Sequence, residues 1–108
     1  MTDTELLELA AKAVGYEYSE IGGGSRHDPK PGIIQPYVRW NPLTDDGDAL
    51  RLAVKLRLWV GQHEDGVTVS DLYARFTVVI EEDHGTDDLA ATRRAIVRAA
   101  AEVGRGQE

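Results

Sequence analysis

The sequence of 108 residues contains no cysteine, which excludes disulfides, thiolate nucleophiles and cysteine-ligated zinc. It also lacks an apolar run near the roughly 18 residues that are needed to span a bilayer. The N-terminus has no basic segment followed by an apolar stretch, so the sequence predicts no signal peptide. We therefore expect a soluble, cytoplasmic protein that does not contact a membrane.

The chain has fewer basic than acidic residues, and its formal net charge is −7. Proteins that bind duplex nucleic acid neutralise phosphates with a basic face, so this charge disfavours direct duplex binding. Many of the acids fall within 45–48, 64–65 and 81–88. Solubility and helix starts explain such acids. The alternative is an acidic surface that imitates nucleic acid and inhibits a host protein.

Length and composition predict one domain. A chain of 108 residues with 42% hydrophobic residues has the usual size and content of a single globular unit. We assign this domain to residues 1–104 and predict that residues 105–108 form a disordered tail.

Three segments have the apolar spacing of helices, and they are residues 2–15, 44–56 and 86–103. Thr2 and Glu5 have the spacing of a capping box. Thr44 and Thr86 are the predicted N-caps of the other two helices, and the aspartates that follow each of them suit the positive end of the helix dipole.

Residues 58–82 have the alternation of strands, with Asp65-Gly66 as the predicted hairpin turn. Phe76, Val78 and Ile80 are expected on one face of the last strand. Strands joined by short turns form an antiparallel meander. The predicted fold class is therefore α+β, a layered α/β/α sandwich with a small antiparallel sheet and three helices.

Residues 16–41 are predicted to be largely irregular, with short strands at either end. The segment holds a Gly22–Gly24 triplet and three prolines. Connections longer than about 12–15 residues are uncommon in compact domains and are often functional. We therefore expect this segment to be free for recognition.

Two stretches carry a family resemblance: WNPLTDDGDALRLAVKL at residues 40–56 and AATRRAIVRAAAEVG at residues 90–104. Together they resemble the phage ABA sandwich domain family, which is encoded by tailed phages and prophages. The resemblance implies α/β/α layers and a phage or prophage origin. It implies no enzyme activity and supplies no site residues, and residues 16–39 lie outside it.

Basic and aromatic residues surround the glycine triplet. Arg26, Tyr37, Arg39 and Trp40 are the candidate ligand-binding residues, because charge pairing and stacking are what a nucleotide-like anion needs. The triplet is not a P-loop, and glycines often mark a flexible loop apex. Trp40 and Trp59 also fit core positions, since tryptophan is usually buried.

The predicted meander brings residues 63–65 near residues 82–84, so His63 and His84 lie among carboxylates. Their spacing matches no zinc or calcium motif, and we predict no metal and no cofactor. The last helix carries Arg93, Arg94 and Arg98. They fit a solvated face or a partner-binding face.

No catalytic constellation is present. None of the serines lies in a GxSxG motif. We therefore predict that the protein is not an enzyme but a phage or prophage accessory protein that binds an unknown host or phage protein. The alternatives are a protein that binds or sequesters a small, nucleotide-like anion, and the acidic mimic. Exposed sheet edges are compatible with pairing between two copies of the chain, so a homodimer is a further alternative.

Overall fold

The computed structural model describes residues 1–28, 37–71 and 78–106, and within them the chain forms three α-helices and two antiparallel sheets. The helices are α1 (Asp3–Ala13), α2 (Asp46–Lys55) and α3 (Asp88–Gly106). The first sheet consists of β1 (Glu17–Ser19), β2 (Ser25–His27) and β3 (Val38–Arg39). The second consists of β4 (Leu58–Gln62), β5 (Gly66–Asp71) and β6 (Val79–Asp83). The predicted α+β class is confirmed, as are the three helices and the meander.

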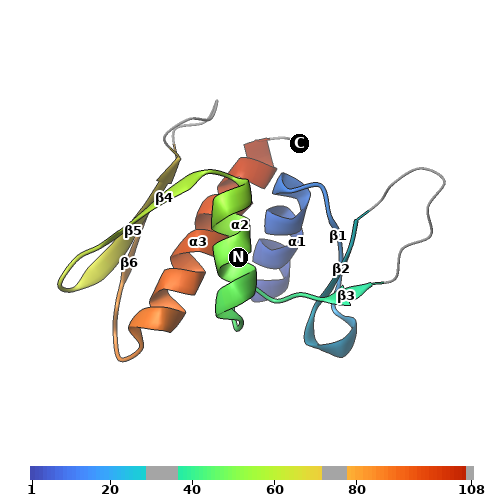
Figure 1. Ribbon diagram of the computed structural model, residues 1–108, viewed down its shortest axis with the longest axis horizontal. Coiled ribbons are helices and arrows are strands. Elements are labelled where there is room, and N and C mark those ends of the chain that lie inside the picture. Colours follow the sequence, from blue (N-terminus) through green and yellow to red (C-terminus); the bar gives the residue numbers. More distant parts are fainter. Residues whose placement is uncertain (29–36, 72–77, 107–108) are drawn as a thin grey trace.

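The helices lie between the two sheets (Figure 1). α3 packs on β5 and β6, α1 packs along α3, and α1 also contacts β1. α2 lies across the front of the helix pair in this view and leads directly into β4. No helix in the described part of the chain is long and apolar enough to cross a bilayer.

The core is built on a close approach of α1 and α3. Ala10 of α1 and Ala95 and Ala99 of α3 are fully buried, and their small side chains let the two backbones come together. The approach is also close at Gly104, where a Cβ atom would lie 2.0 Å from the carbonyl oxygen of Leu9. Only glycine fits at that position.

The second sheet follows the predicted alternation. Val67 and Val69 are buried against the helices, and the intervening residues of β5 are half-buried. The hairpin between β4 and β5 is confirmed, but its turn is one residue earlier than predicted. His63 N–H donates to the carbonyl oxygen of Gly66 at 2.7 Å, so Glu64 and Asp65 make the turn. The predicted position of Phe76 lies outside the described residues.

The N-cap of α1 is confirmed. Its capping box is present, with Glu5 N–H donating to the Thr2 hydroxyl at 3.1 Å. Hydrogen bonds from the Thr2 side chain and backbone hold the pKa of Glu5 below its usual value. Because this pKa is lowered on folding, the capping interaction is complete above the ordinary pKa of a glutamate and weakens as the pH falls below it.

The predicted N-caps of α2 and α3 are each wrong by one residue. Asp45, not Thr44, caps α2 by accepting from Asp48 N–H at 2.8 Å. Asp87, not Thr86, accepts from Ala90 N–H at 3.0 Å. A carboxylate acceptor directly follows each threonine and takes the capping position.

The end of α3 also differs from the prediction. The helix continues past the expected stop at Gly104 and ends at Gly106, inside the predicted tail. Gly104 is buried against α1, so it serves packing between helices there and does not act as a terminator. Residues 107–108 lie outside the described part.

The segment expected to be irregular forms the first sheet over much of its described length. Register is set by Tyr18 opposite Arg26 and by Arg26 opposite Val38. The glycine triplet connects β1 to β2, and each of its residues has a positive φ. Trp40 directly follows β3 and enters the core, with 4% of its surface exposed. Part of this segment therefore forms regular structure and core, while Gly22, Gly23 and β3 are exposed, and its role in recognition stays a prediction.

Candidate functional site

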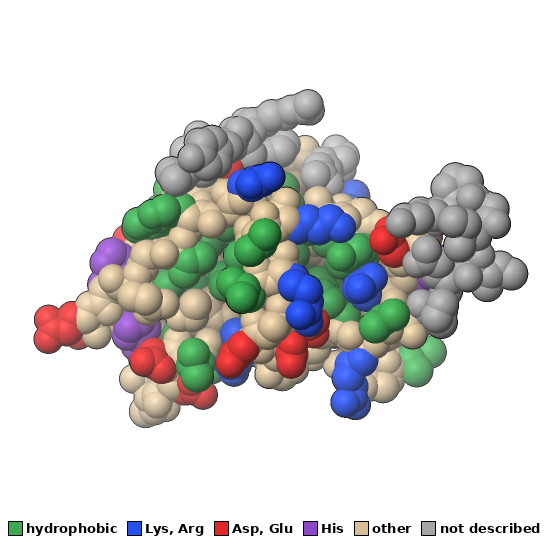
Figure 2. All heavy atoms as spheres, in the orientation of Figure 1, with side chains coloured by type: hydrophobic (Ala, Val, Ile, Leu, Met, Phe, Trp, Pro, Cys, Tyr) green, Lys and Arg blue, Asp and Glu red, His purple; other side chains and the backbone are tan. Residues whose placement is uncertain are grey.

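A pocket of about 190 Å³ lies where α2 faces the first sheet. We call it the cationic pocket, and its lining residues are Val14, Tyr16, Arg26, Val38, Arg39, Trp40, Asp48, Arg51, Leu52 and Lys55. Figure 2 shows Lys and Arg side chains gathered on this face, between α2 and the strands β1–β3. Four of the chain's 12 basic residues therefore meet at one place.

One tyrosine holds two of these cations. The Arg26 guanidinium lies 4.5 Å from the centre of the Tyr16 ring, and the Lys55 ammonium lies 4.6 Å from it. Lys55 Nζ also donates to the Tyr16 hydroxyl at 3.3 Å. Cations over an aromatic face are stabilised by its quadrupole, so Tyr16 keeps two like charges at the same pocket.

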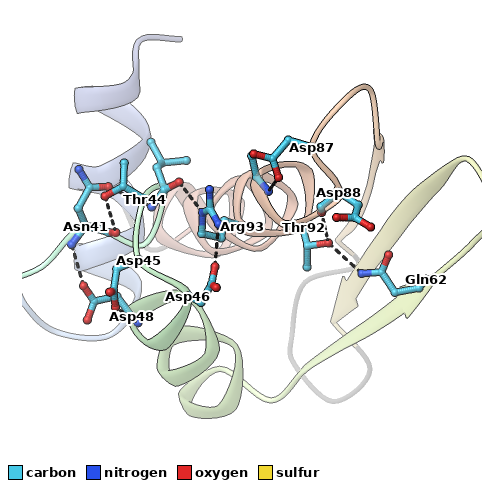
Figure 3. A network of polar contacts seen from close by, with 12 residues as sticks. Asn41, Thr44, Asp45, Asp46, Asp48, Gln62, Asp87, Asp88, Thr92 and Arg93 are labelled. Atoms are coloured by element: carbon cyan, nitrogen blue, oxygen red, sulfur yellow. Dashed lines mark hydrogen bonds and ion pairs between the residues drawn. The ribbon is translucent and has the colours of Figure 1, made fainter.

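The described lining of the pocket contains one carboxylate, Asp48, and it is almost fully buried. One oxygen accepts from Asn41 N–H at 3.0 Å and the other from Arg51 Nη2 at 2.8 Å. Figure 3 shows Asp48 pointing at Asn41 from the first turn of α2. The hydrogen bond to Asp48 raises the pKa of Arg51 above its ordinary value, so this guanidinium stays charged.

Replacing Asp48 with alanine should lower the free energy of unfolding by about 1–3 kcal/mol, because it leaves the Asn41 amide without its acceptor. Urea denaturation measures this change. The control is Asp83→Ala, an exposed aspartate on β6 that should change stability by less than about 0.5 kcal/mol. An equal loss in the two variants would contradict the structural role of Asp48.

The remaining cation, Arg39, is the one most available to a ligand. It is exposed at the end of β3, and no hydrogen bond or ion pair joins it to another described residue. Four cations against one carboxylate give the pocket a local charge of +3 in a chain whose net charge is −7. The arrangement therefore favours an anion.

Three of the four predicted ligand-binding residues line this pocket. Arg26, Arg39 and Trp40 are brought together by the pairing of β2 with β3. Tyr37 is not among the lining residues; it is 52% exposed, and its ring lies 5.3 Å from that of His27.

Trp40 reaches the pocket wall without offering a stacking platform. Its ring is packed edge-on by Tyr16 at 5.9 Å and by Tyr18 at 6.1 Å between ring centres. The Tyr16 ring is not free for stacking either, since Arg26 and Lys55 both lie against it. Recognition in the pocket therefore depends on charge and hydrogen bonding.

Sequence reasoning missed Arg51 and Lys55. The sequence signal is their spacing of four residues, which places both on one face of α2. The sequence does not show that this face turns toward Arg26 and Arg39, since those two lie on strands that are formed from a different segment.

The histidines near the hairpin turn contact neutral polar side chains. His63 Nε2 is 2.7 Å from the Thr68 hydroxyl, and His84 Nε2 is 2.8 Å from Gln62 Oε1. Within residues 1–28, 37–71 and 78–106, no group of three histidine or carboxylate side chains can hold a metal ion.

The arginines of α3 connect elements of the fold. Arg93 donates to the carbonyl oxygen of Leu43 and to Asp46, both at distances under 3 Å (Figure 3). Arg94 pairs with Asp3, and Arg98 pairs with Glu82. These ion pairs favour a structural role over a free binding face.

No protein-family model, curated protein or solved structure matches this chain. The resemblance to phage ABA sandwich proteins therefore stays a prediction from the sequence.

Proposed function

We propose that this protein binds a small anion of the phosphate type in the cationic pocket and acts by binding rather than catalysis. The observation that carries the proposal is the convergence of Arg26, Arg39, Arg51 and Lys55 on one cavity of an acidic chain. Like charges repel, and Asp48 is the single carboxylate among the described lining residues, so the four cations there exceed the negative charge of the lining. An anionic ligand supplies the missing countercharge.

Phosphate fits the donors better than a halide would. A guanidinium presents N–H groups in a planar fork that matches two phosphate oxygens, and a lysine adds a point charge. Arg39 has no described partner to give up, so it binds an anion without breaking another ion pair. Among the described residues, the only side-chain interaction of the Arg26 guanidinium is with the ring of Tyr16.

The composition of the pocket supports binding without chemistry. Its described lining holds no histidine and no serine. Its one carboxylate, Asp48, accepts hydrogen bonds from Asn41 and Arg51, so it is engaged in holding the fold. A general base needs a free acceptor within reach of the reacting proton.

The sequence resemblance adds the proposal that the protein is a phage or prophage accessory protein. A pocket for a small anion fits a protein that sequesters a soluble host compound. Binding of a host or phage protein and the acidic-mimic alternative remain predictions from the sequence, and neither has a described surface that favours it over the pocket.

The test is calorimetric titration of the protein with inorganic phosphate at constant ionic strength, since salt screens exposed charges. We expect saturable binding, and we expect Arg39→Gln to weaken it by about tenfold or more, the value of a lost charge-assisted contact. The matched control is Arg57→Gln, which removes an equal charge from an exposed residue outside the pocket.

Two outcomes would overturn the proposal. One is the absence of phosphate binding at millimolar concentrations. The other is an equal loss of affinity in Arg39→Gln and Arg57→Gln, because that result would mean attraction to the overall charge and no specific site.

A further inference from the structure

A second cavity adjoins the cationic pocket. It has a volume of about 440 Å³, and its lining residues are Gly22, Gly23, Arg39, Asn41, Thr44, Asp45, Asp48 and Arg51. Arg39, Asp48 and Arg51 line both cavities. A ligand that lies across Arg39 and Arg51 therefore occupies both cavities, with one part of the ligand in each cavity.

The two cavities differ in charge. The cationic pocket has an excess of three positive charges, whereas the adjoining pocket balances Arg39 and Arg51 against Asp45 and Asp48. A second phosphate in the adjoining pocket would meet the Asp45 carboxylate, which also pairs with Arg51 at 3.8 Å. The part of a ligand that lies there is thus expected to be neutral and polar.

Hydrogen-bonding groups in the adjoining pocket suit hydroxyls. Asp45 uses one carboxylate oxygen to accept from Asp48 N–H, and its Oδ1 has no hydrogen bond to a described residue. The Thr44 hydroxyl makes only a long contact of 3.4 Å with the Asn41 carbonyl. A carboxylate oxygen and a hydroxyl beside an arginine accept from and donate to vicinal hydroxyl groups.

The same pocket offers no surface for a nucleobase. None of its described lining residues is aromatic, and Trp40 is buried in the core. Stacking on aromatic side chains is a common way for proteins to hold bases, as in those that bind single-stranded nucleic acid. Gly22 leaves open space where a side chain would stand, so a ligand can approach the backbone there.

We propose that the ligand is a phosphorylated polyol of the sugar phosphate class, with its phosphate in the cationic pocket and its hydroxyls against Asp45 and Thr44. This inference rests on the proposed function and adds the chemistry of the ligand's uncharged part.

The experiment compares four probes by calorimetric titration: orthophosphate, ribose 5-phosphate, ribose and adenosine 5′-monophosphate. We expect ribose 5-phosphate to bind at least about tenfold more tightly than orthophosphate, which corresponds to one or two added hydrogen bonds. Ribose alone should not bind at millimolar concentrations. The adenine nucleotide should bind no more tightly than ribose 5-phosphate.

Two variants test which residues bind the hydroxyl groups of the ligand. Asp45→Asn keeps an N-cap, since asparagine caps helices as well as aspartate does, but it replaces an acceptor with a donor. It should weaken ribose 5-phosphate binding by about fivefold without weakening orthophosphate binding. Asp46→Asn is the matched control, because Asp46 is the next residue and pairs with Arg93 outside the pocket. Thr44→Val, which replaces the hydroxyl with a methyl group of similar size, should act in the same direction as Asp45→Asn.

The failures of the two proposals are distinguishable. If orthophosphate binds but ribose 5-phosphate binds no more tightly, the polyol inference is wrong and the anion site stands. If the nucleotide binds more than about tenfold more tightly than ribose 5-phosphate, the ligand has a base and this inference is also overturned. If none of the phosphates binds, both proposals fail.

Discussion

Replacing Gly104 with valine should lower the free energy of unfolding by about 3 kcal/mol or more, because the added side chain cannot fit between α1 and α3. A Cβ atom at this position would lie 2.0 Å from the carbonyl oxygen of Leu9 and 2.8 Å from its carbonyl carbon. Both neighbours are backbone atoms, so relief requires α1 to move as a whole. Urea denaturation followed by circular dichroism measures the loss.

The control for Gly104→Val is Gly106→Ala at the exposed end of the same helix. Alanine favours a helix more than glycine does, so this variant should be neutral or slightly stabilising. A cooperative unfolding transition of wild-type midpoint in Gly104→Val would show that α1 and α3 do not approach as closely as the structure has them. Loss of all folded signal in that variant would agree with the close packing.

Replacing Trp40 with alanine should cost about 3–5 kcal/mol, the usual range for removing a large buried aromatic ring. Trp40 is 4% exposed, and the rings of Tyr16 and Tyr18 pack edge-on against it. The backbone N–H of Trp40 also donates to the carbonyl oxygen of Gly24 at 3.0 Å, and the substitution keeps this hydrogen bond. The loss therefore reports on the ring, and thermal or urea denaturation measures it.

Trp59→Ala is the matched control for Trp40→Ala. The two tryptophans have the same side chain, but Trp59 lies on β4 with 45% of its surface exposed and its ring over Gly61. Removing it should cost roughly 1–2 kcal/mol, in proportion to the smaller area that it buries. A larger loss for Trp59→Ala than for Trp40→Ala would contradict the placement of the core.

The Trp40 variant also bears on the binding site. Trp40 forms part of the wall that Arg26 and Arg39 share. If a fraction of Trp40→Ala stays folded, its phosphate affinity should fall, although the substitution removes no charge. The expected reason is that the two arginines lose the packing that orients them.

The tryptophans show how far the sequence alone could predict the fold. Composition favours burial of both, yet the structure buries Trp40 and leaves Trp59 half-exposed. Trp40 directly follows β3, and Trp59 lies on β4. Trp40 is covered by Tyr16 and Tyr18, which come from an earlier segment of the chain, so its burial is a property of the assembled fold.

The sequence determined the local elements of this protein: three helices, the β4–β5–β6 meander and the Thr2–Glu5 capping box, because these depend on residue spacing and on contacts between near neighbours. The tertiary structure alone decided that Arg51 and Lys55 of α2 meet Arg26 and Arg39 of the first sheet. Side chains from segments that are distant in the sequence meet only where packing brings their backbones together, and the spacing of residues along a chain does not specify that arrangement. The candidate binding site is for this reason a product of the fold, although each of its cations can be read from the sequence.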